Sequence, residues 1–257
     1  MATRSVRSSS LLAFVLHRYD WSESSLILDL FTREEGRLAV AAKGAKRPYS
    51  QLRSVLLPFQ RINVGLSRGA GADPAIEVQN LRAAEWAGGR AMLSGAALFS
   101  GFYLNELLMK LVARHDPHQA LFDAYAETLG TLAEAVDPKS EAALRAFELT
   151  LLREIGVLPD LSIATQTQRP VVAGARYGLL AESGVGAVGD DEAGLDGTTL
   201  VGVQAALEHG SQPALQQACS VALPELKGLL RAQLHYHLGS SVLRTRQVMV
   251  EAQNLEY

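Results

Sequence analysis

The 257-residue sequence has a single cysteine, Cys219, and lacks any apolar run long enough to cross a membrane. One thiol excludes an internal disulfide and a zinc site built from cysteines alone. The apolar run from Leu11 to Leu16 has six residues, whereas a membrane-spanning helix needs about 20 and a signal-peptide core about 7 to 15. We therefore interpret this run as a first β-strand and expect a cytoplasmic protein with no membrane partner.

The sequence also lacks the motifs of common enzymes. It has no Gly-Lys-Ser/Thr phosphate loop, no Gly-x-Ser-x-Gly elbow and no His/Asp spacing typical of a triad. The glycine string from Gly184 to Gly189 resembles a dinucleotide fingerprint, but three acidic residues follow where a helix would have to begin. His235 and His237 point to different faces of a helix, and His115 and His118 have no evident third ligand. We expect no catalytic residue, no metal, no cofactor and no enzymatic activity.

Acidic residues are absent between Glu35 and Asp73, although the whole chain has a formal charge of -3. Residues 1–90 carry 13 basic and 8 acidic side chains, whereas residues 91–230 carry 8 basic and 17 acidic ones. The cations of the acid-free window are Arg37, Lys43, Lys46, Arg47, Arg53, Arg61 and Arg68. This asymmetry favours contact of the N-terminal part with a nucleic acid or a membrane surface, and a solvated basic face is the alternative.

Short apolar runs separated by turn residues predict an all-β N-terminal part. The runs are residues 11–16, 26–31, 37–42, 56–66 and 75–81. The second and third runs are joined by a polar segment that ends in Gly36, which is typical of a β-hairpin. Five short strands within about 80 residues predict a small barrel or sandwich. An OB-type barrel fits the strand count, although the count alone does not select it.

From about Gly88 the apolar residues follow the helical period. One helix face carries Leu104, Leu107, Leu108, Leu111 and Val112. The predicted fold class is α+β, with a five-stranded OB-type β-barrel in residues 1–84 and a mostly α-helical domain in residues 85–257. An irregular insert near residues 158–199 interrupts the helices and is rich in Gly, Thr and Gln, with a small hairpin expected from Val171 to Leu180.

A basic loop after the third expected strand is the best candidate for a binding site. The predicted DNA-binding residues are Arg37, Lys43, Lys46, Arg47, Tyr49 and Arg53. Cations neutralise phosphates, and aromatic rings can stack on unpaired bases. The residues alone leave Tyr49 open between stacking and an ordinary loop position, and they favour a core position for Trp21 and Phe59.

Several segments resemble the RecO family of bacterial DNA repair proteins. They are residues 14–17 (Phe-Val-Leu-His), 21–26 (Trp-Ser-Glu-Ser-Ser-Leu), 30–32, 36–37, 42–48 (Ala-Lys-Gly-Ala-Lys-Arg-Pro), 57–59, 101–108, 143–149 and 234–246. The resemblance spans nearly the whole chain, and residues 21–26 and 42–48 are its most specific parts. It implies an N-terminal OB fold followed by a helical domain. It also implies binding of single- and double-stranded DNA, annealing of complementary strands without ATP, and association with the nucleoid.

The same resemblance implies protein partners. Family members act with RecR and help RecA displace the single-stranded-DNA-binding protein (SSB), whose acidic, apolar C-terminal tail they hold on the helical domain. Arg145 matches a position implicated in gripping that tail, and Leu144 and Leu149 complete the predicted SSB-tail site. Some family members carry a cysteine-cage zinc module in the stretch that matches Leu158 to Leu180. This stretch contains no cysteine, so zinc is not carried over.

Two functions of other classes stay open from the residues. OB barrels also bind RNA, so an RNA-binding translation or ribosome factor is one alternative. A protein-interaction scaffold that does not bind DNA is the other. Preference for RNA over DNA of the same sequence would favour the first, and absent or salt-independent DNA binding would favour the second.

Overall fold

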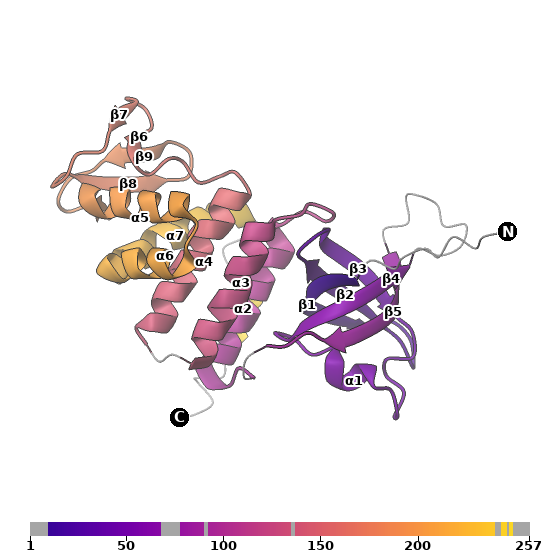
Figure 1. The fold of residues 1–257 in the computed structure, drawn as a ribbon. Helices are drawn as coiled ribbons and strands as arrows, with labels where there is room; N and C mark the ends of the chain where they lie inside the picture. The colour runs from indigo at the N-terminus through magenta and orange to yellow at the C-terminus, as the bar shows by residue number, and fades with distance from the viewer. Residues whose placement is uncertain are drawn as a thin grey trace. The chain divides into compact units, whose positions relative to one another are not determined.

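The structure, a computed structural model, describes residues 10–67, 78–89, 92–134, 137–239, 243–245 and 247–248 (Figure 1). By their packing, these residues form two compact units. The first unit holds the chain up to Leu93 together with Leu107–Phe122, and the second holds Ser94–Glu106 and the chain from Asp123 onward. The expected division into residues 1–84 and 85–257 stays a prediction.

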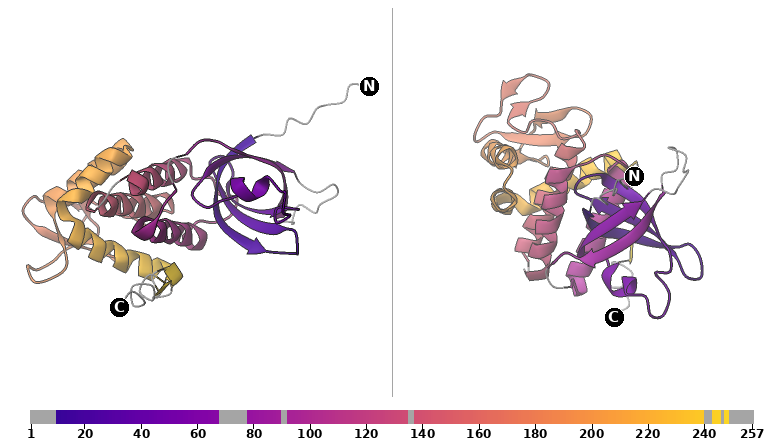
Figure 2. Two further views of the ribbon diagram at one scale, coloured as in Figure 1. Left: turned by 90° about the horizontal axis from the view of Figure 1, so that it is seen from below. Right: turned by 45° about the vertical axis from the view of Figure 1, so that its right-hand side comes forward.

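Five strands of the first unit form a closed barrel (Figure 2). Their order around the barrel is β1-β2-β3-β5-β4. They are β1 (Ser10–Asp20), β2 (Leu26–Thr32), β3 (Gly36–Ala42), β4 (Arg61–Ser67) and β5 (Val78–Trp86). Paired strands are antiparallel except β3 and β5, which are parallel. The predicted OB-type barrel is confirmed. Of the expected last strand, residues 75–77 lie outside the described residues.

Alternating side chains fill the inside of this barrel. The buried cluster contains Leu11, Ala13, Val15, Leu28, Leu30, Leu38, Val40, Ala42, Ala45, Leu56, Ile62 and Val64. Gly36 begins β3 with a φ of 70°, in the left-handed region that favours glycine. A Cβ atom at this position would lie 2.1 Å from the carbonyl oxygen of Asp116. The tight β2–β3 turn and the close approach of the 116 backbone therefore both require glycine.

The outer face of β1 and β2 is buried as well. Phe14 and Phe31 alternate with the core residues and pack against Phe122, with ring centroids 5.2 and 5.5 Å apart. Phe122 lies in the first turns of α3 (Gln119–Glu134), which belong to the first unit along with the end of α2 (Gly95–Leu111). Burial on two faces explains why β2 and β3 have nearly continuous apolar sequences.

A short helix, α1 (Leu52–Val55), lies at one end of the barrel (Figure 1). Leu52 and Val55 pack against the barrel core, and Leu56 is fully buried beside them. The expectation that a strand begins at residue 56 is wrong, because β4 begins only at Arg61. The segment after β3 therefore covers one end of the barrel with its apolar side chains.

The second unit is mostly helical, as predicted. Besides parts of α2 and α3 it contains α4 (Lys139–Glu154), α5 (Gly197–His209), α6 (Gln212–Cys219), the short 3-10 helix η1 (Ser220–Ala222) and α7 (Leu223–Leu238). Helix α4 packs against α6 and α7, and α6 packs against α5. Phe147 of α4 lies edge-on to Tyr125, with ring centroids 6.2 Å apart. None of the helices within the described residues is long and apolar enough to span a bilayer.

Two small sheets occupy the insert between α4 and α5. One pairs β6 (Ile163–Ala164) with β7 (Arg169–Pro170), and the other contains β8 (Arg176–Leu180), β9 (Gly184–Ala187) and β10 (Leu195–Asp196). Thr165 joins the sheets, because its N–H donates to Val185 O at 2.8 Å and its Oγ1 accepts from the Val185 N–H at 2.9 Å. The expected small hairpin is present, but it joins β8 to β9 and so extends beyond the expected stretch from Val171 to Leu180. The glycine string enters β9 and opens no helix.

Candidate nucleic-acid interface and partner pocket

The basic loop is attached to the turn between β1 and β2. The Lys46 N–H donates to Ser24 O at 3.0 Å, and Lys46 Nζ donates to Ser22 O at 3.2 Å. Lys46 Nζ also forms an ion pair with Asp20 Oδ1 at 3.0 Å. The Gly44 N–H donates to Ser25 Oγ at 3.4 Å. The loop and the turn therefore form one surface, which we call the basic edge and define as residues 17–25 and 43–53.

Three of the predicted DNA-binding cations are exposed on the basic edge. Lys43, Arg47 and Arg53 are exposed, and none of the ion pairs within the described residues uses them. Lys46 differs, because Asp20 partly neutralises it. Arg18 is also exposed and donates from Nη1 to Leu56 O at 3.3 Å. Sequence reasoning missed Arg18, which precedes the acid-free window and lies two residues after the apolar run from Leu11 to Leu16.

Aromatic side chains lie among these cations. Tyr49 is 98% exposed, Trp21 56% and Tyr19 47%. The core position expected for Trp21 is wrong, because this residue follows the last residue of β1 in a turn that points to solvent. The rings of Tyr19 and His17 are in edge contact, with centroids 4.4 Å apart. Phe59, the other aromatic residue expected in the core, is half-buried.

A surface hollow lies at this edge and extends to neighbouring leucine side chains. It is lined by Arg18, Asp20, Leu26, Ala45, Lys46, Leu52, Arg53, Leu56 and Leu57. Apolar side chains from the end of the barrel form part of its wall, and cations stand beside them. A nucleotide is complementary to this hollow, because its base has an apolar face and its phosphate is an anion.

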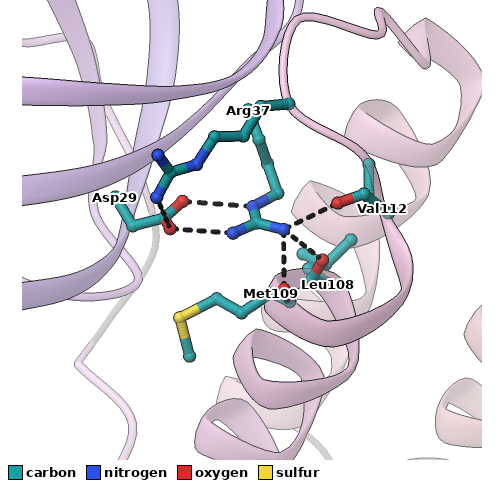
Figure 3. Close-up of polar contacts among 6 residues, drawn as sticks. Asp29, Arg37, Leu108, Met109 and Val112 are labelled. Atoms are coloured by element: carbon teal, nitrogen blue, oxygen red, sulfur yellow. Dashed lines mark hydrogen bonds and ion pairs between the residues drawn. The ribbon is translucent and has the colours of Figure 1, made fainter. Parts of the chain in front are cut away.

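Arg37 does not belong to this exposed set (Figure 3). Its Nε and Nη2 donate to the two carboxylate oxygens of Asp29 at 3.1 and 2.8 Å. Its Nη1 donates to the carbonyl oxygens of Leu108, Met109 and Val112 at 3.4, 2.6 and 2.6 Å. All three nitrogens are thus engaged and the side chain is buried. The expectation that Arg37 contacts DNA is corrected: it binds the carbonyl end of α2.

This contact also changes which part of the barrel is accessible. OB folds commonly bind oligonucleotides on the face of the second and third strands and on adjoining loops. Here Phe31 and Arg37 of that face are covered by residues 108–122 of the same unit. The exposed cations and aromatic rings are instead concentrated in the turn and loop of the basic edge.

A second pocket lies within the helical unit. It is lined by Phe99, Ser100, Tyr103, Leu144, Arg145, Glu148, Lys227, Arg231, Leu234, His235, Leu243 and Thr245, and its cavity volume is about 250 Å³. Glu106 fixes the last of these residues, because its carboxylate accepts hydrogen bonds from the Arg244 and Thr245 N–H groups at 3.0 Å each. We call this site the cationic pocket, because it combines apolar side chains with Arg145, Lys227 and Arg231.

The structure places two of the three predicted SSB-tail residues at the cationic pocket. Leu144 and Arg145 line it. Leu149 is fully buried in the core of the unit and is not among the lining residues, so its assignment to the site is corrected. Five residues along a helix correspond to about 140° of rotation, which turns Leu149 away from the face of Leu144. Sequence reasoning missed Tyr103 and Glu148, which come from different helices.

Arg145 is held by a buried carboxylate. Arg145 Nη2 donates to Glu148 Oε1 at 2.6 Å, and Tyr103 Oη donates to the same oxygen at 2.7 Å. Burial raises the pKa of Glu148 above its usual value, against the opposing effect of the nearby Arg145 charge. Burial, and next the charge of Glu148, also raise the pKa of Tyr103.

A closed OB barrel with a cationic, aromatic edge defines an OB-fold nucleic-acid-binding protein, here with a helical unit attached. Residues 8–82 match the family described as "Recombination protein O N terminal", and residues 92–247 match "Recombination protein O C terminal". The chain belongs to the RecO family of DNA repair proteins.

Relatives similar over nearly their whole length carry the same name. The DNA repair protein RecO of Polaromonas naphthalenivorans (strain CJ2) is 51% identical over 253 residues, which cover 98% of this chain and 99% of the relative. The DNA repair protein RecO of Verminephrobacter eiseniae (strain EF01-2) is 49% identical over 245 residues, covering 95% and 96%. That of Variovorax paradoxus (strain S110) is 48% identical over 252 residues, covering 95% and 96%. The role that follows is DNA repair and recombination.

Proposed function

We propose that the protein is a non-enzymatic recombination mediator that binds single- and double-stranded DNA through its basic edge. It anneals complementary strands without ATP and, together with RecR, helps load RecA on SSB-coated DNA. The observation that supports this most is the exposure of Lys43, Arg47 and Arg53 around Tyr49, on a loop bonded to the β1–β2 turn.

The physical basis of annealing is charge screening. Two DNA strands repel each other through their phosphates, and cations that contact both backbones lower this repulsion. Exposed rings such as those of Tyr49 and Trp21 can hold unpaired bases by stacking until they find their partners. No bond is made or broken in this process, so no catalytic group is required.

The cationic pocket is the proposed site for the SSB tail. An acidic peptide with apolar residues matches a pocket that combines Phe99, Leu144 and Leu234 with Arg145. Arginine is suited to a terminal carboxylate, because charge-assisted hydrogen bonds between the two are short and directional. The tail would bring SSB-coated DNA to the protein, and the basic edge would act on the DNA.

The test is annealing of two SSB-coated complementary oligonucleotides without nucleotide. The variant Lys43→Glu/Arg47→Glu reverses two exposed charges and avoids Lys46, whose side chain holds the loop to Asp20. Its matched control is Lys139→Glu/Arg169→Glu, which makes the same charge change at exposed positions of the second unit.

We expect rapid annealing by the wild type and the control, and slow annealing by the basic-edge variant. Equal rates for all three proteins would move the DNA site elsewhere. Failure of the wild type on coated and bare strands alike would overturn the annealing function. Tighter binding of RNA than of DNA with the same sequence would favour an RNA-binding factor instead.

A further inference from the structure

The two carboxylate oxygens of Glu148, which lines the cationic pocket, differ in their hydrogen bonds. Its Oε1 accepts from both Tyr103 Oη and Arg145 Nη2. Its Oε2 is buried and has no hydrogen-bond partner within the described residues, and the same is true of Arg145 Nε. Glu148 itself is 1% exposed. The ionised carboxylate is therefore only half satisfied, and the arginine that it holds is not saturated either.

The groups around Glu148 come from four helices. Tyr103 lies on α2, Glu141 and Arg145 on α4, Cys219 on α6, and Lys227, Arg231 and His235 on α7. Lys227 Nζ is paired with Glu141 Oε1 at 2.7 Å. Burial raises the pKa of the Cys219 thiol to about 12, so this neighbour is neutral. Among the described residues that line the pocket, Glu148 is thus the single acid, and the other charged ones are cations.

An anionic ligand at Arg145 would meet this carboxylate. Arg145 Nη2 is already bonded to Glu148, so a peptide carboxylate on the same guanidinium would lie close to the Glu148 carboxylate, and the two anions would repel each other. A proton on Glu148 removes the repulsion and leaves Arg145 with an uncompensated positive charge. The bare Oε2 favours this neutral form, because an ionised oxygen without a partner is poorly solvated inside a protein.

We propose that Glu148 is a positioning residue that couples binding of an acidic peptide in the cationic pocket to uptake of one proton. In the free pocket the ionised Glu148 orients Arg145. When the peptide binds, Glu148 takes a proton from the solvent, and the positive charge of Arg145 is then neutralised by the peptide carboxylate. The inference rests on the proposed function of this pocket and adds its regulation. Peptide affinity is then highest in mild acid. It falls by up to about tenfold for each pH unit above the pKa of Glu148, the slope of one linked proton.

The experiment is calorimetric titration of the full-length protein with a short aspartate-rich peptide that ends in phenylalanine. His235 also lines the pocket, and histidine charge changes near neutral pH. The comparison is therefore made in a His235→Gln background, with and without Glu148→Gln. Titrations in two buffers of different protonation enthalpy count the protons taken up.

We expect the parent protein to take up close to one proton in part of the range above pH 4.5, the usual pKa of a glutamate, and to lose affinity as the pH rises. Glu148→Gln should take up none and should have a flat profile, because glutamine is neutral at every pH. Equal proton uptake by the two proteins would overturn the inference, and so would a flat profile for the parent.

The outcomes distinguish failure of the proposed function from failure of this inference alone. If no peptide binds at any pH, the proposed function of the pocket fails and the inference fails with it. If peptide binding depends on Arg145 but not on Glu148 or pH, only the inference fails. Should Glu148→Gln not fold, Tyr103→Phe serves instead, because loss of its hydrogen bond raises the pKa of Glu148 further. The fall in affinity should then move to higher pH, and an unmoved profile would contradict the coupling.

Discussion

Two buried arginines, one in each unit, differ in how completely their charge is satisfied. Arg37 uses all three guanidinium nitrogens, two toward Asp29 and the third toward three carbonyl oxygens. Arg145 donates through Nη2 to Glu148, and its Nε has no partner within the described residues. Buried polar groups are normally hydrogen-bonded, and those that are not require an explanation. A saturated arginine stabilises the fold, whereas an unsaturated one beside a pocket can still bind a ligand.

Loss of Arg37, whose guanidinium nitrogens are all hydrogen-bonded, should reduce the free energy of unfolding most. Arg37→Ala leaves the buried Asp29 carboxylate with the longer ion pair to Arg114 Nη2, at 3.7 Å, and removes the donors from the carbonyl end of α2. We expect a loss of about 3 to 5 kcal/mol in the free energy of unfolding, the usual cost of one missing partner in a buried pair. Urea denaturation measures it.

The control is the double variant Asp29→Asn/Arg37→Met, which removes both charges and should recover part of the loss. Arg145→Ala should cost clearly less, because Glu148 can accept a proton once its partner is gone. Equal losses for Arg37→Ala and Arg145→Ala would contradict the distinction between the two arginines.

Removal of exposed cations from the basic edge should weaken DNA binding. The triple variant Lys43→Ala/Arg47→Ala/Arg53→Ala removes three of five cations on the basic edge, the others being Arg18 and Lys46. The slope of log K against log salt for single-stranded DNA should change from about -3.5 to about -1.4, and affinity at about 0.1 M salt should fall about a hundredfold. Fluorescence anisotropy across a salt series measures both quantities.

Stability of this triple variant should be unchanged, in contrast to Arg37→Ala. Lys139→Ala/Arg169→Ala, which removes exposed cations of the second unit, should leave the slope as it is in the wild type. A slope that drops equally in both variants would mean that DNA responds only to net charge.

A smaller effect is expected from the exposed aromatic ring. Tyr49→Ala should weaken binding of single-stranded DNA by about 1 to 3 kcal/mol if one base stacks on the ring. Binding of duplex DNA should be unaffected, because paired bases are not free to stack on a side chain. Tyr236→Ala, at a tyrosine of the second unit that is 53% exposed, is the control. Equal loss for single strands and duplex would argue against stacking.

The barrel could be predicted from sequence because its signals are local. Strand alternation and the glycine of the β2–β3 turn are each contained within a few residues. The role of Arg37 could not be predicted, because its acceptors other than Asp29 are main-chain carbonyl oxygens 71 to 75 residues away. A carbonyl acceptor is present at every residue and leaves no pattern in the sequence.

The residues of the cationic pocket could be predicted from the sequence only in part. Helical geometry alone could have excluded Leu149, because it lies five residues from Leu144 and on another face. The same geometry places Glu148 three residues from Arg145 and within reach of it. Tyr103 comes from a separate helix, and the sequence contains no sign of its contact with Glu148. Position along one helix is thus predictable, whereas contacts between helices require the tertiary structure.

Glu148, the partner of Arg145, should add a small pH-dependent component to the stability of the fold. The pKa of Glu148 in the folded protein is raised above its usual value of 4.5, first of all by burial. Folding therefore binds a proton at this site, and the associated stabilisation is complete below pH 4.5 and is lost as the pH rises through the folded-state pKa. Its slope cannot exceed about 1.4 kcal/mol per pH unit. Glu148→Gln should remove this component from urea denaturation measured across the pH range, while Asp29→Asn should leave it in place. If the pH dependence survives Glu148→Gln, the carboxylate is ionised throughout and Arg145 is as firmly committed to the fold as Arg37.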